Sequence, residues 1–418
     1  MNALRQNPLS LLFAFQKNPY YFFDQMKPDD CRQIKRVYLG PRRFYFCYHP
    51  DHAKHILQDN KANFPKSSLV LNKILPLSGP SGLIQLNDKE ALPVRKSSGR
   101  LMCPHNAQRL GKFVGSFVEE KYTEFDKAAT TNEAVDLKPF LTQLVLRTAG
   151  IFILDQDIQS KAEKLNQAFV ELNRMAGESL RSIVSFPYSP KRNRYLKVIH
   201  EELDRIIDDR LSDDRVSLLH ELSKKNFSRS FLRDQVKAFM FAGYDTTASS
   251  LIFAVDSIAR NQKAQERINQ EHSKSYLEAL YTQAAYKESL RLYPSAYFLP
   301  RQVANDDVIS GQKIKANSQV FISIRHIHQN KDIYENPMEF NPERFLKEQP
   351  HTHGFIPFGG GPRICIGAPL AMMEATIVLQ KLCKRYKISP LNQQPPEIEG
   401  LITAHTKSPL SVRLERRV

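Results

Sequence analysis

The segment Phe355–Ala375 reads FIPFGGGPRICIGAPLAMMEA, and its pattern decides how the rest of the chain is interpreted. A glycine-rich loop leads into an apolar stretch with helical spacing, and Cys365 stands just before this predicted helix begins. The first backbone N–H groups of a helix have no partner within it, and the positive end of the helix dipole lies beside them. Both features stabilise a thiolate, so the segment predicts that Cys365 is an anionic ligand.

Four neighbours of the cysteine suit such a site. Gly361 and Gly367 allow tight turns and let a flat ligand approach the backbone. Phe358 can cover the sulfur, and Arg363 can reach an anionic group of the ligand. The loop is therefore predicted to hold a planar, partly anionic group against the thiolate.

A second segment points to an internal site. The stretch Ser230–Arg260 has no proline and keeps apolar residues at helical spacing after a possible serine cap. It predicts one helix of about 30 residues, roughly 45 Å long, which has to cross the interior. Its centre reads Ala242-Gly243-Tyr244-Asp245-Thr246-Thr247, a glycine among polar residues where a buried helix usually has none. We therefore expect a functional site at this point.

The remaining elements predict a mainly α fold with small β-sheets. Leu196–Leu211 has the apolar spacing of an amphipathic helix, and an N-terminal helix around Leu9–Phe15 is expected to pack on the body. Arg36–Tyr48 predicts two short strands around a Gly-Pro turn. Gln302–Ile324 contains a hairpin-like segment with a turn near Ser310–Gly311.

The cysteine loop resembles a known family. Phe358, Gly361, Arg363, Cys365 and Gly367 match the spacing F-x-x-G-x-R-x-C-x-G, which is similar to the signature of the cytochrome P450 family. The resemblance implies haem b (iron protoporphyrin IX) as cofactor, with Cys365 as the axial ligand of its iron.

The same resemblance implies the fold in more detail. We expect a triangular, prism-like haem domain over residues 1–418, an α+β structure with a long central helix over the haem. A β-rich lobe is expected mainly over residues 30–60 and 295–325 plus the C-terminal part, and an α-rich lobe mainly over 85–292 and 365–387.

The centre of the long helix is similar to the family's oxygen-activation motif. The resemblance implies that Asp245 is the acid and Thr246 the alcohol of a proton relay, which makes them the predicted catalytic residues. Ala242 and Gly243 are predicted to lie beside the haem, with Gly243 leaving room for dioxygen.

Two further motifs follow in the family's order. Glu288 and Arg291 form an E-x-x-R pair, and Arg344 belongs to a P-E-R-F element, so the three are predicted to form a buried structural network. The segment after Leu292-Tyr293-Pro294 resembles the one that passes the substrate pocket and supplies Arg301 to a haem propionate, as Arg363 is predicted to do. The predicted pocket residues are Ala296, Tyr297, Phe298 and Leu299, with parts of Val70–Ile84.

The chain departs from the family in one place. Family members commonly carry W-x-x-x-R or H-x-x-x-R where this chain has Asp88–Arg100, and Ala91 or Leu92 stands in place of the aromatic residue. Pro93 is unusual inside a helix unless the helix starts there. Arg95 is the predicted propionate partner from this segment, with Lys96 as the alternative.

Charge and cysteine content restrict partners and compartment. Lysine and arginine outnumber aspartate and glutamate by 60 to 44, giving a net charge of +16, which suits an acidic partner. The basic residues are dispersed without a zinc-finger or RNP-like pattern, so nucleic acid is not the expected partner. Five widely spaced cysteines indicate a reducing cytoplasm. The N-terminal apolar run is shorter than the ~20 residues that cross a membrane, so no transmembrane anchor is expected. The protein is also expected to be a monomer.

Together these features predict a monooxygenase that oxidises an apolar organic substrate with dioxygen. Because no flavin or iron–sulfur domain is expected in the chain, electrons would come from a separate ferredoxin or flavodoxin and its NAD(P)H reductase. A peroxide-driven peroxygenase is one alternative, against which Asp245 and Thr246 argue, because such an enzyme needs no proton relay. A non-catalytic haem binder or gas sensor is another, and the histidine pairs at 326/328 and 351/353 are not expected to bind a metal.

Overall fold

The structure is a computed structural model that describes residues 8–39, 42–101, 104–181, 189–211, 217–347 and 351–417. The predicted mainly α fold with small sheets is confirmed. The helices are α1 (Pro8–Lys17), α2 (Pro19–Met26), α3 (Pro50–Lys54), α4 (Ser68–Ser78), α5 (Asp88–Leu101), α6 (Pro104–Glu120), α7 (Tyr122–Thr131), α8 (Leu137–Leu154), α9 (Gln159–Arg181), α10 (Pro190–Leu211), α11 (Leu218–Ser223), α12 (Arg229–Ala259), α13 (Gln262–Gln270), α14 (Leu280–Leu292), α15 (Ile324–His328) and α16 (Ala368–Arg385). Shorter helical turns are η1 (His55–Asp59), η2 (Lys61–Asn63), η3 (Pro342–Leu346) and η4 (Gly361–Arg363).

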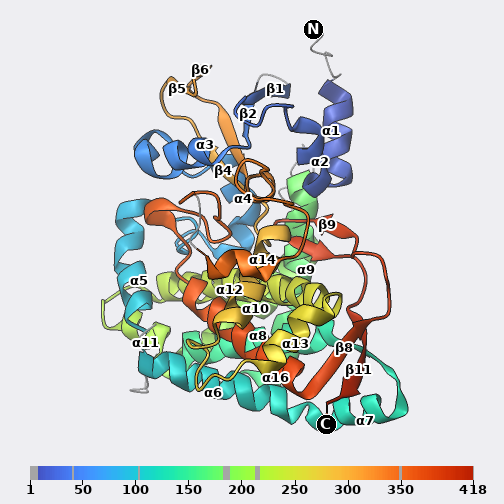
Figure 1. Ribbon diagram of the computed structural model, residues 1–418. Coiled ribbons are helices and arrows are strands. Elements are labelled where there is room, and N and C mark those ends of the chain that lie inside the picture. The colour runs from blue at the N-terminus through green and yellow to red at the C-terminus, as the bar shows by residue number, and fades with distance from the viewer. Residues whose placement is uncertain are drawn as a thin grey trace.

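The strands form small sheets at the edges of the helical body. They are β1 (Lys35–Leu39), β2 (Arg42–Cys47), β3 (Ala134–Asp136), β4 (Phe298–Gln302), β5 (Asp307–Ile309), β6 (Gln312–Ile314), β7 (Gln319–Ser323), β8 (Tyr386–Pro390), β9 (Ile398–Gly400), β10 (Ala404–Thr406) and β11 (Ser411–Arg416). The largest sheet has the order β1-β2-β7-β4 and lies with α1 and α2 at one end, whereas β8 and β11 lie beside α7 at the other (Figure 1). The division into two lobes of one domain stays a prediction.

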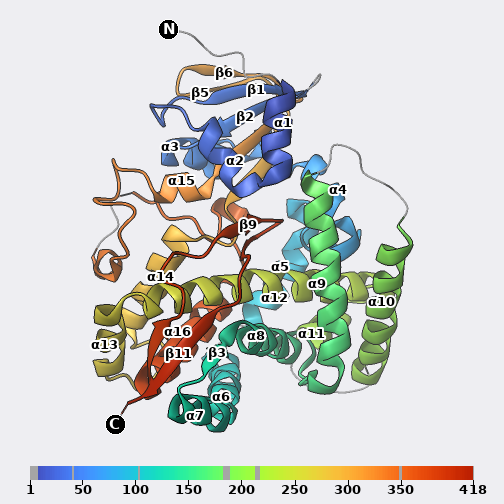
Figure 2. The same ribbon diagram turned by 90° about the vertical axis from the view of Figure 1, so that its right-hand side faces the viewer.

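The long helix α12 runs through the middle of the body, where α8, α14, α4 and α10 pack against it (Figure 2). It matches the predicted Ser230–Arg260 to within one residue, and its cap is Ser228, whose Oγ accepts a hydrogen bond from Phe231 N at 3.2 Å. Both α8 and α12 are long and apolar enough to cross a membrane. Because 72% and 78% of their most apolar windows are buried in the fold, they also fit the description of core helices.

The shorter predicted elements also form. Helix α10 buries the apolar face that its spacing predicts, at Ile199, Leu203, Ile206 and Ile207. Strands β5 and β6 pair as a hairpin whose turn has positive φ at Ser310 (48°) and Gly311 (76°). The two strands predicted in Arg36–Tyr48 are β1 and β2, and their Gly-Pro turn lies outside the described residues.

Helix α5 begins five residues before Pro93. Asn87 caps it, because its side chain accepts from Glu90 N at 3.0 Å while Glu90 Oε2 accepts from Asn87 N at 3.2 Å. Pro93 therefore lies inside the helix, and the alternative of a helix that starts there is wrong. The proline lacks an N–H donor, so the helix lacks one backbone hydrogen bond at this position.

Candidate active site

The cysteine loop holds its sulfur at the start of α16. Cys365 N donates to Phe358 O at 2.9 Å, and this bond closes the loop. The backbone N–H groups of Gly367 and Ala368 donate to the thiol. Burial raises the pKa of the Cys365 thiol, whereas these two donors oppose the rise. The sulfur belongs to an exposed residue that borders a cavity, so a cation bound in that cavity would stabilise the thiolate.

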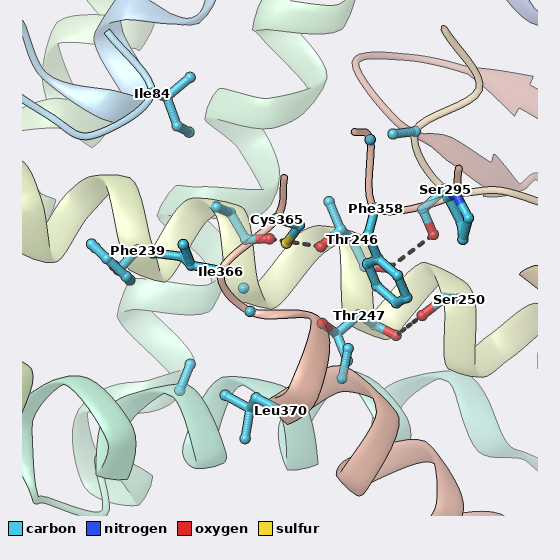
Figure 3. A pocket seen from close by; sticks show the side chains of 18 of the residues that line it. Ile84, Phe239, Thr246, Thr247, Ser250, Ser295, Phe358, Cys365, Ile366 and Leu370 are labelled. Atoms are coloured by element: carbon cyan, nitrogen blue, oxygen red, sulfur yellow. Dashed lines mark hydrogen bonds between the residues drawn. The ribbon is translucent and has the colours of Figure 1, made fainter. Parts of the chain in front are cut away.

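A cavity of about 340 Å³ separates this loop from α12 (Figure 3). It brings together most of the residues predicted from the sequence. The predicted residues that border it are Ala242, Gly243, Thr246, Ala296, Leu299, Arg301, Phe358, Arg363, Cys365 and Gly367. Of the predicted range 70–84, Leu83 and Ile84 border the cavity.

The centre of α12 presents two different faces. Thr246 faces the cavity, and its Oγ donates to Ala242 O at 2.7 Å (Figure 3). A Cβ atom added to Gly243 would meet no atom within 4 Å, because this position opens onto the cavity. Asp245 lies on the other side of the helix, buried against Asn173, whose Nδ2 donates to it at 2.5 Å. The predicted acid is therefore adjacent to the cavity in sequence but does not border it.

The three residues of the predicted network are in contact. Arg291 donates to both carboxylate oxygens of Glu288, from Nε at 2.7 Å and from Nη2 at 2.8 Å, and both side chains are fully buried. Arg344 Nε donates to Glu288 Oε1 at 3.1 Å. Arg291 also donates to the backbone oxygens of His328 and Pro337, so the network ties α14 to the segment that precedes the cysteine loop.

Four basic side chains converge beside the cavity, and we call them the cationic cluster: Lys66, Arg95, Arg301 and Arg363. The carboxylate of Asp88 pairs with this group. It accepts hydrogen bonds from Arg363 Nε at 2.6 Å and from Arg363 Nη2 at 3.0 Å. Burial and then the three arginines lower the pKa of Lys66 to about 8, and burial followed by Arg363 lowers that of Arg301 to about 10. The cluster thus has more positive charge than Asp88 neutralises.

Sequence comparison covers almost the whole chain. The family described as cytochrome P450 matches residues 9–413. The chain belongs to the cytochrome P450 family. A putative cytochrome P450 132 of Mycobacterium tuberculosis is 26% identical over 423 residues, covering 92% of this chain and 90% of the relative. The protein LUTEIN DEFICIENT 5, chloroplastic, of Arabidopsis thaliana is 24% identical (92% and 72% covered), and cytochrome P450 97B2, chloroplastic, of Glycine max is 25% identical (92% and 81% covered).

Family membership makes this P450 a haem-thiolate monooxygenase, and its residues fit the haem. Cys365 offers a sulfur with two backbone donors, as an iron ligand requires. The cationic cluster offers the uncompensated charge that the two haem propionates would neutralise. Arg95 belongs to this cluster and donates to Ile364 O, whereas Lys96 is exposed, so the structure favours Arg95 over Lys96 as the partner from α5.

The prediction that Tyr297 and Phe298 line the substrate pocket is wrong. They pack in an aromatic cluster with Phe23, where the Phe298 and Phe23 rings stack at 5.3 Å and the Tyr297 and Phe298 rings meet edge-on at 4.9 Å. Tyr297 Oη also donates to Leu401 O at 2.9 Å. Both side chains therefore point away from the cavity that Ala296 and Leu299 border.

Gly361 packs against another part of the protein, whereas the sequence predicted that it would face the flat ligand. It has a φ of +65°, and an added Cβ would lie 2.1 Å from Leu57 O. The glycine is therefore needed where the loop packs on η1, and it does not border the cavity. Gly367 does border it.

Sequence reasoning missed several cavity residues. Glu374 on α16 borders the cavity, and burial raises its pKa well above the ordinary value. The sequence offered one signal for this residue, because Glu374 is a single carboxylate within the apolar stretch that follows Cys365. Lys66 of the cationic cluster had no signal, because it belongs to none of the motifs found in the sequence. Helix α8 contributes a further part of the wall through Val145, Ala149, Phe152 and Ile153.

Replacing Arg301 with glutamine is expected to weaken haem retention. The substitution removes a buried positive charge from the cationic cluster, and a charged hydrogen bond contributes about 1.5–3 kcal/mol, which corresponds to roughly 10- to 100-fold faster haem loss. Haem transfer to apomyoglobin measures the rate. Lys96→Gln is the matched control because Lys96 is exposed, and equal rates in the two variants would contradict the assignment.

Proposed function

We propose that this P450 hydroxylates or otherwise oxidises an apolar organic molecule with dioxygen. The apolar wall of the cavity between Cys365 and α12 is the observation that supports this proposal. Its apolar members are Leu83, Ile84, Val145, Ala149, Phe152, Ile153, Ala238, Phe239, Leu290, Ala296, Leu299 and Leu370. Such a wall binds a ligand mainly by removing apolar surface from water. Fatty acids, terpenoids, steroids and aromatic natural products all fit this chemistry.

The electrons are proposed to come from a separate acidic ferredoxin or flavodoxin with its NAD(P)H reductase. The net charge of +16 supports this part of the proposal, because opposite charge speeds the encounter of two proteins. We also propose that the protein works as a monomer in the cytoplasm, and the free thiols of Cys31, Cys47 and Cys383 agree with a reducing compartment.

The residues around the cavity are proposed to manage protons. When bound, the haem iron supplies the binding and activation of dioxygen. Thr246 presents a hydroxyl at the cavity, and Ser295 Oγ donates to Thr246 O at 2.9 Å, which fixes the turn that holds it. Asp245 lies on the other side of α12 as a buried carboxylate. Its pKa is lowered, because His405 and its hydrogen-bond partners outweigh the effect of burial. Asp245 thus accepts a proton and Thr246 holds one where oxygen is reduced.

Replacing Thr246 with alanine is expected to separate electron consumption from product formation. The hydroxyl that holds a proton at the cavity is lost, so product per electron should fall by about 10²-fold while hydrogen peroxide rises. Product and peroxide are measured in the same reaction. Thr246→Ser keeps a hydroxyl and should restore most of the coupling, and an uncoupled serine variant would contradict this role.

Oxygen-isotope labelling tests the proposed function. A panel of one fatty acid, one terpene, one steroid and one polycyclic aromatic compound is first screened for a spin-state change of the haem. The responding compound is then incubated under ¹⁸O₂ with a ferredoxin system, and the product is expected to carry one ¹⁸O atom. Product that forms only with added peroxide would favour a peroxygenase, and no product from any compound would contradict the proposal.

A further inference from the structure

Asp245 is connected to the protein surface by two side chains of the β9–β10 hairpin. Thr403 Oγ donates to Asp245 Oδ2, and Thr403 is 4% exposed. His405 Nε2 lies 2.8 Å from Thr403 Oγ and 3.4 Å from Asp245 Oδ1. The side chain of His405 is 22% exposed, whereas that of Asp245 is 6% exposed. The three side chains therefore form a continuous path from solvent to the buried carboxylate.

The donors and acceptors along this path fix its direction. The hydroxyl of Thr403 has one hydrogen, which it gives to Asp245, so it accepts from His405. His405 Nε2 must then carry a hydrogen. Each group donates toward the carboxylate, which is the arrangement that carries a proton inward.

The hairpin holds this path firmly against α12. Ser249 Oγ donates to Ala404 O, and Ala404 N donates to Ser295 O at 2.8 Å. Helix α9 packs on the same hairpin, because a Cβ added to Gly177 would lie 2.7 Å from Leu401 Cδ2. Figure 2 shows β9 of this hairpin above α12 and beside α9.

From this geometry we infer that His405 is the residue through which solvent protons reach Asp245 during oxygen reduction. This inference rests on the proposed function. From its imidazolium form, His405 passes its Nε2 proton to Thr403 Oγ as the Thr403 proton passes to Asp245 Oδ2, which leaves neutral imidazole and a protonated carboxyl. Asp245 then releases its proton to the side of α12 on which Thr246 presents its hydroxyl, and a hydronium ion from solvent reprotonates His405. Two such cycles supply the two protons that O₂, two electrons and substrate RH need to give ROH and H₂O.

The other charged and titratable groups around His405 are placed differently. Glu399 is its cross-strand partner in the hairpin. Lys138 Nζ donates to Thr406 O at 2.9 Å, and Lys407 pairs with Glu397. Tyr244 neighbours Asp245 on α12, where burial and then the charge of Asp245 raise the pKa of its hydroxyl, so it keeps its proton. His405 contacts both Thr403 and Asp245.

Two ways of driving the same reaction test the inference. Styrene is the probe, and epoxide formation is measured once with a ferredoxin system and dioxygen and once with hydrogen peroxide, which brings its own two protons. His405→Gln is expected to slow the ferredoxin-driven reaction about tenfold or more, to raise its solvent deuterium isotope effect and to leave the peroxide-driven reaction unchanged. Thr403→Val should behave in the same way.

The matched control is His55→Gln. The side chain of His55 is 29% exposed and its Nε2 lies 2.9 Å from Asp307 Oδ2, so it repeats the histidine–carboxylate pair away from the cavity. Equal losses in both reactions of His405→Gln would show a structural role and overturn the inference, as would an unchanged ferredoxin-driven rate. If styrene is not oxidised, the responding compound of the panel replaces it, and a wild type that is inactive in both reactions with every compound would overturn the proposed function, and the inference with it.

A second readout does not depend on turnover. In the diamagnetic ferrous carbon monoxide complex, the ¹⁵N resonance of His405 Nε2 is assigned by its absence from His405→Gln. It is expected to shift in Thr403→Val, because the Nε2–H group loses its acceptor, and to stay in place in His55→Gln. An unshifted resonance in Thr403→Val would contradict the hydrogen-bonded path.

Discussion

Replacing Cys365 with histidine is expected to abolish monooxygenase activity while the protein keeps its fold. Histidine can still bind haem iron, but it cannot supply the electron density by which a thiolate favours cleavage of the O–O bond. The loop itself should survive, because Cys365 contributes a backbone N–H to Phe358 O and its side chain faces the cavity, outside the packed core. Product formation and far-ultraviolet circular dichroism measure the two effects.

Cys31→Ser is the control for this substitution. Cys31 is half-buried and lies outside the cavity, where its sulfur accepts a hydrogen bond from Asn330 at 3.4 Å. Its replacement should leave product formation unchanged. A Cys365→His variant that retains activity, or a Cys31→Ser variant that loses it, would contradict the assignment of Cys365 as the functional thiolate.

Replacing Glu288 with glutamine is expected to destabilise the protein by about 3–5 kcal/mol and to reduce the haem content of the purified protein. The substitution leaves Arg291 fully buried, and Arg344 largely buried, without the negative charge that both contact. Because Arg291 also holds the backbone at Pro337, the effect should spread to the segment that leads into the cysteine loop. Urea unfolding and the haem-to-protein absorbance ratio measure the two effects.

The control pair has the same spacing on a helix surface. Lys121 and Glu124 form an i,i+3 ion pair at 2.8 Å, with the Glu124 side chain 62% exposed. Because an exposed pair contributes about 0–1 kcal/mol, Glu124→Gln should change the free energy of unfolding by no more than this amount. Similar losses in Glu288→Gln and Glu124→Gln would contradict a buried structural network.

The sequence predicted the parts of the site that lie on a single segment. The cysteine loop and the centre of α12 each carry their chemistry within a few residues, so the sequence pattern indicated Cys365 as a ligand and a functional site on the helix, and the family resemblance indicated Thr246. It also predicted α12 itself, because a long proline-free run with helical spacing has few other solutions.

The predictions failed where neighbours in sequence point in opposite directions. In strand β4, alternate side chains face opposite sides, so Leu299 and Arg301 face the cavity while Phe298 faces the aromatic cluster. Treating residues 296–299 as one pocket-lining run ignored this alternation. Asp245 and Thr246 separate for a related reason, because successive residues of a helix are about 100° apart around its axis.

Other parts depend on contacts between distant segments. The cationic cluster draws Lys66, Arg95, Arg301 and Arg363 from four regions, and the path to Asp245 ends at Thr403 and His405, about 160 residues later in the chain. No local pattern in the sequence marks Lys66, Thr403 or His405, because each is an ordinary polar side chain until the fold brings it to the site.

Thiolate ligation of haem by Cys365 is the central claim, and the absorption spectrum of the ferrous carbon monoxide complex tests it most directly. The wild type, purified with haem, is reduced with dithionite and exposed to carbon monoxide. We expect a Soret band at about 450 nm, the position that thiolate ligation gives in this family. A band at about 420 nm in a well-folded sample would contradict the claim, because the iron would then lack a thiolate ligand.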